Sequence, residues 1–141
     1  ESDLGRDEIA RMHQDGVDFT IGFRSLCEAV SPGEGRENFL KLFYNREVSR
    51  DWVGTWASRL ERDLLESADR TRAMRIANPA YIPRNHRIEE AIVAAVEDDD
   101  FSPFHRLVTV LKSPYQDQPG AEDLRLAPTE GERVERTFCG T

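Results

Sequence analysis

Two stretches of this sequence carry side chains that could react or bind a partner. They are a proline-framed segment near the middle and a cysteine close to the end. Residues 78–85 read Asn-Pro-Ala-Tyr-Ile-Pro-Arg-Asn, so two prolines frame an aromatic ring, a guanidinium and two amides. Proline disfavours the α conformation in the residue before it, which predicts a corner between two helices here. The candidate residues of this corner are Asn78, Pro79, Tyr81, Arg84 and Asn85.

The corner has two interpretations, one functional and one structural. In the first, it presents Tyr81 and Arg84 to the surface of a partner protein. In the second, its own amide and guanidinium groups tie the corner down through local hydrogen bonds. The residue types alone leave both interpretations open.

The second candidate is Cys139, third from the end of the sequence. A thiol near a terminus is accessible, and accessible thiols are the ones that undergo exchange. Cys27 lies next to an apolar helical stripe, which is typical of an inert core residue. Two cysteines do not make a disulfide framework, so we expect a reducing cytoplasm as the compartment.

Motifs of nucleotide chemistry are absent from the sequence. It contains no G-x-G-x-x-G and no Walker motif, and Asp18-Phe19 is followed by threonine where a D-F-G motif needs glycine. Neither His86-Arg87 nor His105-Arg106 is followed by the aspartate of a kinase catalytic loop. We therefore assign no catalytic and no cofactor-binding residue in this chain.

Metal ligands are also not indicated. The three histidines have no partner at i+3 or i+4. The acidic run at residues 97–100 could hold a divalent cation through oxygen ligands, but it lacks the spacing and the glycine of a calcium loop. A solvated turn between helices is the simpler interpretation, and we assign no metal ligand.

Composition restricts the class of partner. The chain has 141 residues, a net charge of -8 and 38% hydrophobic residues. An acidic surface disfavours nucleic acid, which requires basic patches, and anionic membrane for the same reason. No apolar run approaches the roughly 20 residues that cross a bilayer. The first residues show neither an initiator methionine nor a signal-peptide pattern, so we expect an internal position in a longer chain.

Helical periodicity dominates the first 114 residues. Apolar residues form one stripe from Phe19 to Val30 and a second from Val53 to Leu64, for which Ser49 is a plausible N-cap. Residues 88–96 make the clearest stripe, and Ser102-Pro103 predicts the start of a last helix. The fold class is therefore all-α: an irregular bundle of about six helices over residues 1–114. Residues 115–141, with several prolines and glycines and few apolar residues, predict an extended tail that is ordered only where it lies on something.

These features together resemble the C-terminal region of the SelO (YdiU) family of pseudokinase-like protein adenylyltransferases. The family shows an Asn-Pro-x-Tyr-x-x-Arg-Asn corner, matched here by residues 78–85, and a later Pro-Tyr step, matched by Pro114-Tyr115. Many bacterial members end much like Phe138-Cys139-Gly140-Thr141. The match is specific from about Arg72 onward and looser before it. It corresponds to about the last third of a family member.

The resemblance implies an activity that this chain does not carry by itself. Family members transfer AMP from ATP to hydroxyl side chains of proteins, with Mg or Mn, in a kinase-like core upstream of this region. The implied partners are that missing core and the protein substrates. Cys139 is the one residue carried over, as a candidate redox residue that forms a disulfide with a cysteine of the core. The alternative is a stand-alone helical module for protein interaction, recruiting partners through the corner at residues 78–85.

Overall fold

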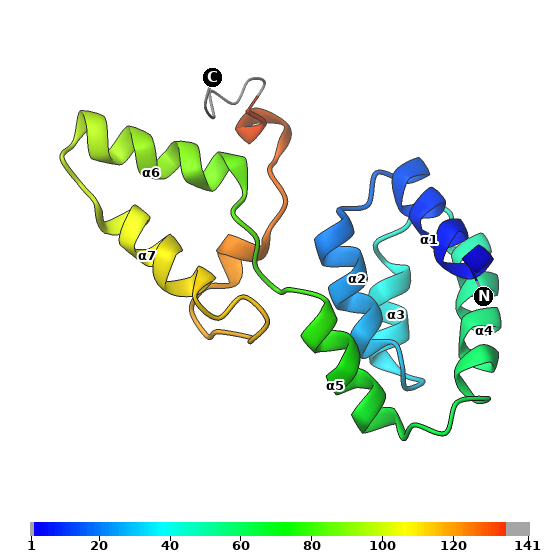
Figure 1. Cartoon of the computed structure of the whole chain (residues 1–141). Coiled ribbons are helices and arrows are strands. Elements are labelled where there is room, and N and C mark those ends of the chain that lie inside the picture. Colours follow the sequence, from blue (N-terminus) through cyan, green and yellow to red (C-terminus); the bar gives the residue numbers. More distant parts are fainter. Residues whose placement is uncertain (1, 135–141) are drawn as a thin grey trace. The chain divides into compact units, whose positions relative to one another are not determined.

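The computed structural model describes residues 2–134, and within this range all regular structure is helical (Figure 1). The predicted all-α class is confirmed. The chain divides after Pro79 into two compact units, Glu1–Pro79 and Ala80–Thr141. The sequence pattern had not indicated a division at this point, because helical stripes continue on both sides of it.

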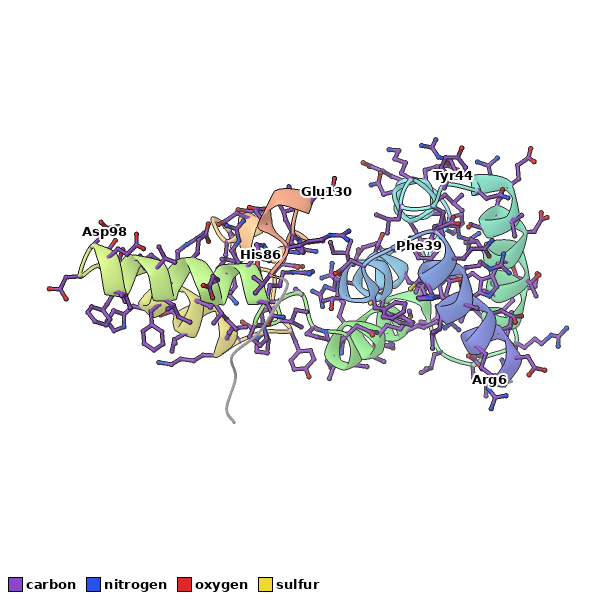
Figure 2. The ribbon with its side chains drawn as sticks, turned by 90° about the horizontal axis from the view of Figure 1, so that it is seen from above. Arg6, Phe39, Tyr44, His86, Asp98 and Glu130 are labelled. Carbon is purple, nitrogen blue, oxygen red and sulfur yellow. The ribbon has the colours of Figure 1, made fainter. Side chains whose placement is uncertain are left out.

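Unit 1 contains five helices around one apolar core (Figure 1). They are α1 (Ser2–Gln14), α2 (Phe19–Glu28), α3 (Glu34–Leu40), α4 (Arg46–Leu60) and α5 (Ser67–Ala77). The core side chains come from α1 to α4 and from the turns after α2 and α3: Met12, Leu26, Ala29, Phe39, Leu40, Phe43, Trp52 and Val53. Figure 2 shows Phe39 inside this unit and Tyr44 on its surface.

Side-chain caps fix where two of these helices begin. The Asp18 side chain accepts a hydrogen bond of 2.9 Å from the backbone N–H of Ile21 at the start of α2. At the start of α4 the Asn45 side chain accepts from the backbone N–H of Val48 at 3.4 Å. Each satisfies one of the amide groups that a helix leaves unpaired in its first turn.

Helix α4 therefore begins and ends earlier than its apolar stripe predicted. Ser49 was the expected N-cap, but it is buried within α4 and Asn45 takes the capping role. The apolar stripe predicts that the helix continues to Leu64, but Leu64 lies beyond the end of α4 and is fully exposed. Periodicity identified the helix, but the cap, which depends on one local hydrogen bond, set its boundary.

Unit 2 is built on a helical hairpin of α6 (Asn85–Glu97) and α7 (Ser102–Leu111), which lie side by side (Figure 1). Its buried residues also come from the chain after α7, including the short 3-10 helix η1 (Glu122–Arg125). The apolar core cluster of unit 2 consists of Ala80, Tyr81, Leu107, Val110, Ala121 and Leu124. A second 3-10 turn, η2 (Glu130–Glu132), follows near the end of the described residues. Part of the expected tail thus packs against the hairpin of α6 and α7, through Ala121 and Leu124.

A bidentate ion pair holds η1 against α7. The two terminal nitrogens of Arg106 donate to the two carboxylate oxygens of Asp123 at 2.8 and 2.6 Å. Arg106 also donates to the carbonyl of Gly120 at 2.8 Å. Because the paired guanidinium favours the ionised carboxylate, the pKa of Asp123 falls to about 2.

Candidate functional site

The first part of the candidate corner, Asn78, belongs to unit 1. Its backbone N–H and its side-chain amide both donate to the carbonyl of Met74 at 2.9 Å, which closes the last turn of α5. Its own carbonyl accepts from Arg24 at 3.0 Å, and the same nitrogen of Arg24 reaches the carbonyl of Arg75 at 3.2 Å. A buried cation at a helix C-terminus satisfies carbonyls that lack partners within the helix. Asn78 thus connects the end of α5 to α2.

The second part, Tyr81, belongs to unit 2. Its ring is 2% exposed, and its hydroxyl donates to the carbonyl of Gln118 at 3.2 Å while accepting from the N–H of Gln118 at 3.1 Å. The backbone N–H groups of Ala80 and Tyr81 both donate to the carbonyl of Pro114, at 2.8 and 3.2 Å. Tyr81 therefore fixes the start of unit 2 to the chain that follows α7.

Arg84 and Asn85 form the start of α6. The Arg84 side chain is buried, and its carbonyl accepts from the N–H groups of Arg87 and Ile88 at 3.0 Å. Asn85 is exposed at the first position of the helix. Because Tyr81 is bonded within its own unit and the Arg84 side chain is buried, the geometry favours the structural interpretation of the corner over the docking one.

Of the two cysteines, Cys27 lies within the described residues and Cys139 does not. The thiol of Cys27 is buried and donates to the carbonyl of Phe23 at 3.3 Å. Burial raises its pKa above the ordinary value, with a smaller opposing effect of Arg24, so the reactive thiolate is scarce at neutral pH. Cys139 lies outside the described residues, and its redox role stays a prediction.

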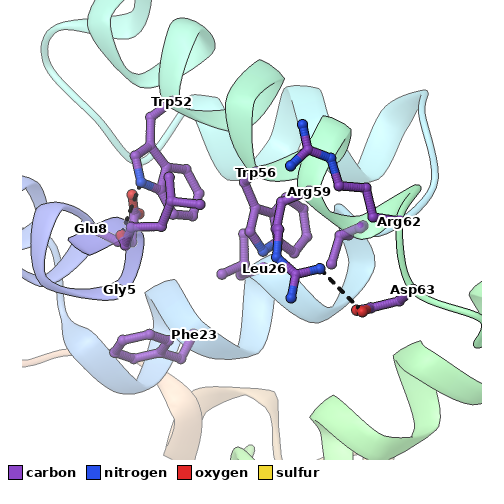
Figure 3. A pocket seen from close by; sticks show the side chains of 11 residues that line it. Gly5, Glu8, Phe23, Leu26, Trp52, Trp56, Arg59, Arg62 and Asp63 are labelled. Carbon is purple, nitrogen blue, oxygen red and sulfur yellow. Dashed lines mark hydrogen bonds and ion pairs between the residues drawn. The ribbon is translucent and has the colours of Figure 1, made fainter. Parts of the chain in front are cut away.

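A groove in unit 1, about 550 Å³ in volume, was not anticipated from the sequence (Figure 3). It lies between α1, α2 and α4, and its walls include Phe23, Leu26, Trp52 and Trp56. The two indole rings stack 5.9 Å apart with an angle of 11° between their planes. Arg59 lies at the groove and pairs with Asp63 at 3.1 Å, as the dashed line in Figure 3 marks.

The groove also contains a buried acid. Glu8 is 1% exposed, and neither of its carboxylate oxygens has a hydrogen-bond partner within the described residues. Arg11 approaches to 4.0 Å, too far for a hydrogen bond. Desolvation raises the pKa of Glu8 to about 7, and the attraction of Arg11 opposes this only in part. A sequence signal existed: Leu4, Glu8 and Met12 are spaced by four, so the acid interrupts an apolar stripe of α1.

Unit 2 has a second hollow, about 510 Å³, between one side of α6 and residues 131–134. His86 lies at one end of it, is buried, and has an Nε2 atom without a hydrogen-bond partner in the described structure. Its pKa is lowered, first by burial and then by Arg87. Its lining also includes four acidic residues and one basic residue: Glu89, Glu90, Asp98, Glu132 and Arg133.

Among residues 2–134 no three side chains of histidine, cysteine, aspartate or glutamate are grouped to hold an ion. In the same range no helix has the length and apolar character needed to cross a bilayer.

Comparison with known proteins identifies the family. Residues 2–112 match the family model described as "Protein adenylyltransferase SelO". A curated relative from Rhizobium etli (strain CIAT 652), named "Protein nucleotidyltransferase YdiU", is 47% identical over 133 residues. Relatives with the same name from Maridesulfovibrio salexigens and Rhodopseudomonas palustris (strain BisB5) are 45% and 43% identical over 139 and 141 residues.

These alignments cover 94%, 99% and 100% of this chain but 27%, 28% and 29% of the respective relatives. The chain therefore spans a little over a quarter of the length of the curated relatives it matches. The family match includes α1 to α7 and ends directly after α7, so the remainder of unit 2 lies outside it. The helical units described above belong to a member of the SelO (YdiU) family of protein nucleotidyltransferases.

Proposed function

We propose that this chain is the non-catalytic, C-terminal helical region of a protein adenylyltransferase. In the proposed reaction, AMP passes from ATP to serine, threonine or tyrosine hydroxyls of proteins, with pyrophosphate as the leaving group. The kinase-like core that binds ATP and Mg or Mn lies outside this chain. The observation that carries the proposal is the family match, which covers most of this chain but a small part of each relative.

The contacts of the two units support a scaffolding role. Two polar residues of the 78–85 corner are engaged within their own units, Asn78 with α2 and α5 and Tyr81 with the chain after α7. Such contacts hold helices in place and leave the chemistry to other parts of the protein. The partners of the region in this proposal are the catalytic core and, through it, the protein substrates.

The proposal is tested with ATP labelled at either the α or the γ phosphate. The longer protein that contains this chain and the 141-residue chain alone are each incubated with a divalent metal and a protein acceptor. Label from the α but not the γ position, with the longer protein only, is the expected result. Label from the γ position identifies a kinase instead. No transfer by either protein, together with capture of a partner by the short chain, supports a stand-alone interaction module.

Cys139 is proposed as a redox residue of the longer protein, which we place in the cytoplasm. Its thiol and a thiol of the core would form a disulfide, losing two protons and two electrons to an oxidant such as glutathione disulfide. We expect AMP transfer to differ between the oxidised and reduced longer protein, and Cys139→Ser to abolish that difference. Equal activity of the two wild-type forms rejects the redox role and leaves the adenylyltransferase proposal unaffected.

A further inference from the structure

The hairpin of unit 2 carries apolar side chains that nothing in the described structure covers. On α6, Ile92 is 50% and Val96 79% exposed. On α7 and its N-cap, the exposed fractions of Phe101, Phe104 and Val108 are 51%, 49% and 38%. Val93 of α6 is also exposed, at 41%, but it lines the hollow beside residues 131–134. Single exposed apolar residues are ordinary, but five more on one hairpin need an explanation. We refer to these five residues as the hairpin face.

Helical geometry places the four helical members on the same side of the hairpin, and Phe101 directly precedes α7. On α6, Ile92 and Val96 follow the partly buried Ile88 by four and eight residues, turned progressively away from it at 100° per residue. On α7, Phe104 and Val108 are turned in the same rotational sense from the buried Leu107. The helices α6 and α7 run in opposite directions. Side chains that are rotated in the same sense from the contact between the two helices therefore point to the same side of the pair.

The surroundings of the hairpin face restrict what can cover it. The turn between the two helices carries an exposed acidic run at residues 97–100, and Figure 2 shows Asp98 at this end of α6. A second copy of the chain would bring two acidic runs and two net charges of -8 together. Anionic lipid is disfavoured for the same reason. The occupant is therefore an apolar surface with neutral or basic groups at its edge.

The polypeptide outside this chain is the occupant that the comparisons favour. The match to the family model includes α6 and all of α7, and the relatives extend to more than three times the length of this chain. We propose that the hairpin face packs against the part of the longer protein that lies outside these 141 residues. The proposal rests on the proposed function, since it takes this chain to work as one region of a longer nucleotidyltransferase.

Thiol labelling in the longer protein tests the proposal with matched pairs. Val96→Cys and Val108→Cys place a thiol on the hairpin face. Glu97→Cys and Thr109→Cys place one on the next residue of each helix, also exposed but turned about 100° away. Alkylation is followed for each peptide by mass spectrometry and divided by the rate in denaturant. We expect Val96→Cys and Val108→Cys to react at least about tenfold more slowly than their neighbours, because a packed thiol reacts only when its contact opens.

The same labelling of the 141-residue chain, with its helicity checked by circular dichroism, identifies the source of protection. Loss of protection in the short chain supports an occupant outside it. Protection that persists there assigns the cover to this chain itself, and protection that rises with protein concentration assigns it to a second copy. Either result overturns the proposal, as do equal rates within each pair in the longer protein.

A second measurement requires no substitution. Hydroxyl-radical oxidation of the wild-type longer protein should modify Phe101 and Phe104 several-fold less than in the short chain, with Tyr44, 95% exposed in unit 1, as the internal reference. Equal oxidation in the two proteins contradicts the proposal. Neither experiment uses ATP or turnover. A negative result therefore rejects the packing of the hairpin face without rejecting the AMP-transfer proposal.

Discussion

The hydroxyl of Tyr81 exchanges two hydrogen bonds with the backbone of Gln118, although the two residues are 37 positions apart in the chain. The side chain of Gln118 extends the network by donating to the carbonyls of Val110 and Ser113 at 2.9 and 3.0 Å. One phenol thus connects the beginning of unit 2 with the turn that follows α7.

Tyr81→Phe should lower the free energy of unfolding of unit 2 by about 1–2 kcal/mol, because the N–H and carbonyl of Gln118 lose a buried partner. Faster hydrogen exchange of the Gln118 amide, measured by NMR, is the direct readout. Tyr115→Phe, at a half-exposed ring of the same unit, serves as the control and should change stability by less than about 0.5 kcal/mol. Unchanged exchange at Gln118 in Tyr81→Phe contradicts the assigned role.

The buried carboxyl of Glu8 predicts a dependence of stability on pH. Its pKa is raised from an ordinary 4.5 to about 7, so between these values the folded chain keeps a proton that the unfolded chain releases. The free energy of unfolding therefore decreases by at most roughly 3 kcal/mol as pH rises through this window and Glu8 is forced to ionise in the folded chain. It stays at the lower value above pH 7.

Glu8→Gln removes this titration, since an amide fills the same space without charge. We expect the variant to be more stable than wild type at pH 8 and nearly equal to it at pH 4.5. Urea unfolding followed by tryptophan fluorescence measures this in unit 1, which contains both tryptophans, Trp52 and Trp56. A stability difference that is the same at both pH values shows that Glu8 does not titrate as described.

Two helical glycines of unit 1 predict opposite effects of alanine. A Cβ at Gly35 would overlap the backbone carbonyl oxygen of Glu28, where α2 and α3 pack closely. Gly35→Ala should therefore destabilise unit 1 by about 1–3 kcal/mol. At Gly54 in α4 nothing lies within 4 Å of the added carbon, so Gly54→Ala should stabilise by up to about 1 kcal/mol. Thermal unfolding of the two variants compares them, and a stabilised Gly35→Ala would show that α2 and α3 are not in this close contact.

The ion pair of Arg106 and Asp123 predicts an unusually acidic carboxyl. Carboxyl carbon NMR should give Asp123 a titration midpoint near 2, and Arg106→Gln should move it up toward the ordinary 3.8. The ionised form stabilises unit 2 above the ordinary pKa, and this contribution is lost as pH falls through the lower value. Arg125→Gln, which removes the partner of Asp117, is the control and should leave the midpoint of Asp123 near 2. A midpoint unchanged by Arg106→Gln rules out the pair as the cause.

Sequence patterns predicted the class of fold because helices follow from local periodicity. The stripe around Leu26, the end of α5 at Asn78 and the hairpin helices were all visible in this way. Boundaries were less accurate, as at α4, because a single capping bond at Asn45 determines where the helix starts. The resemblance to the family came from the corner at residues 78–85 and was confirmed by the family match.

The groove and the role of Tyr81 could not be predicted, for a different reason. Both depend on contacts between residues distant in the chain: Glu8 lies in a groove walled by Trp52 and Trp56, and Tyr81 bonds to Gln118. Local pattern does not encode such pairings without the fold. For the same reason the sequence left open whether Tyr81 faced a partner or its own unit.

The division of the chain after Pro79 changes what the Asn-Pro-x-Tyr sequence means. Asn78 depends on Arg24, 54 positions earlier, and Tyr81 depends on Gln118, 37 positions later. Residues that read as one continuous motif are thus two anchors, each held by contacts within a different unit. A substitution at Asn78 therefore perturbs unit 1 and a substitution at Tyr81 perturbs unit 2, although only two residues separate them in the sequence.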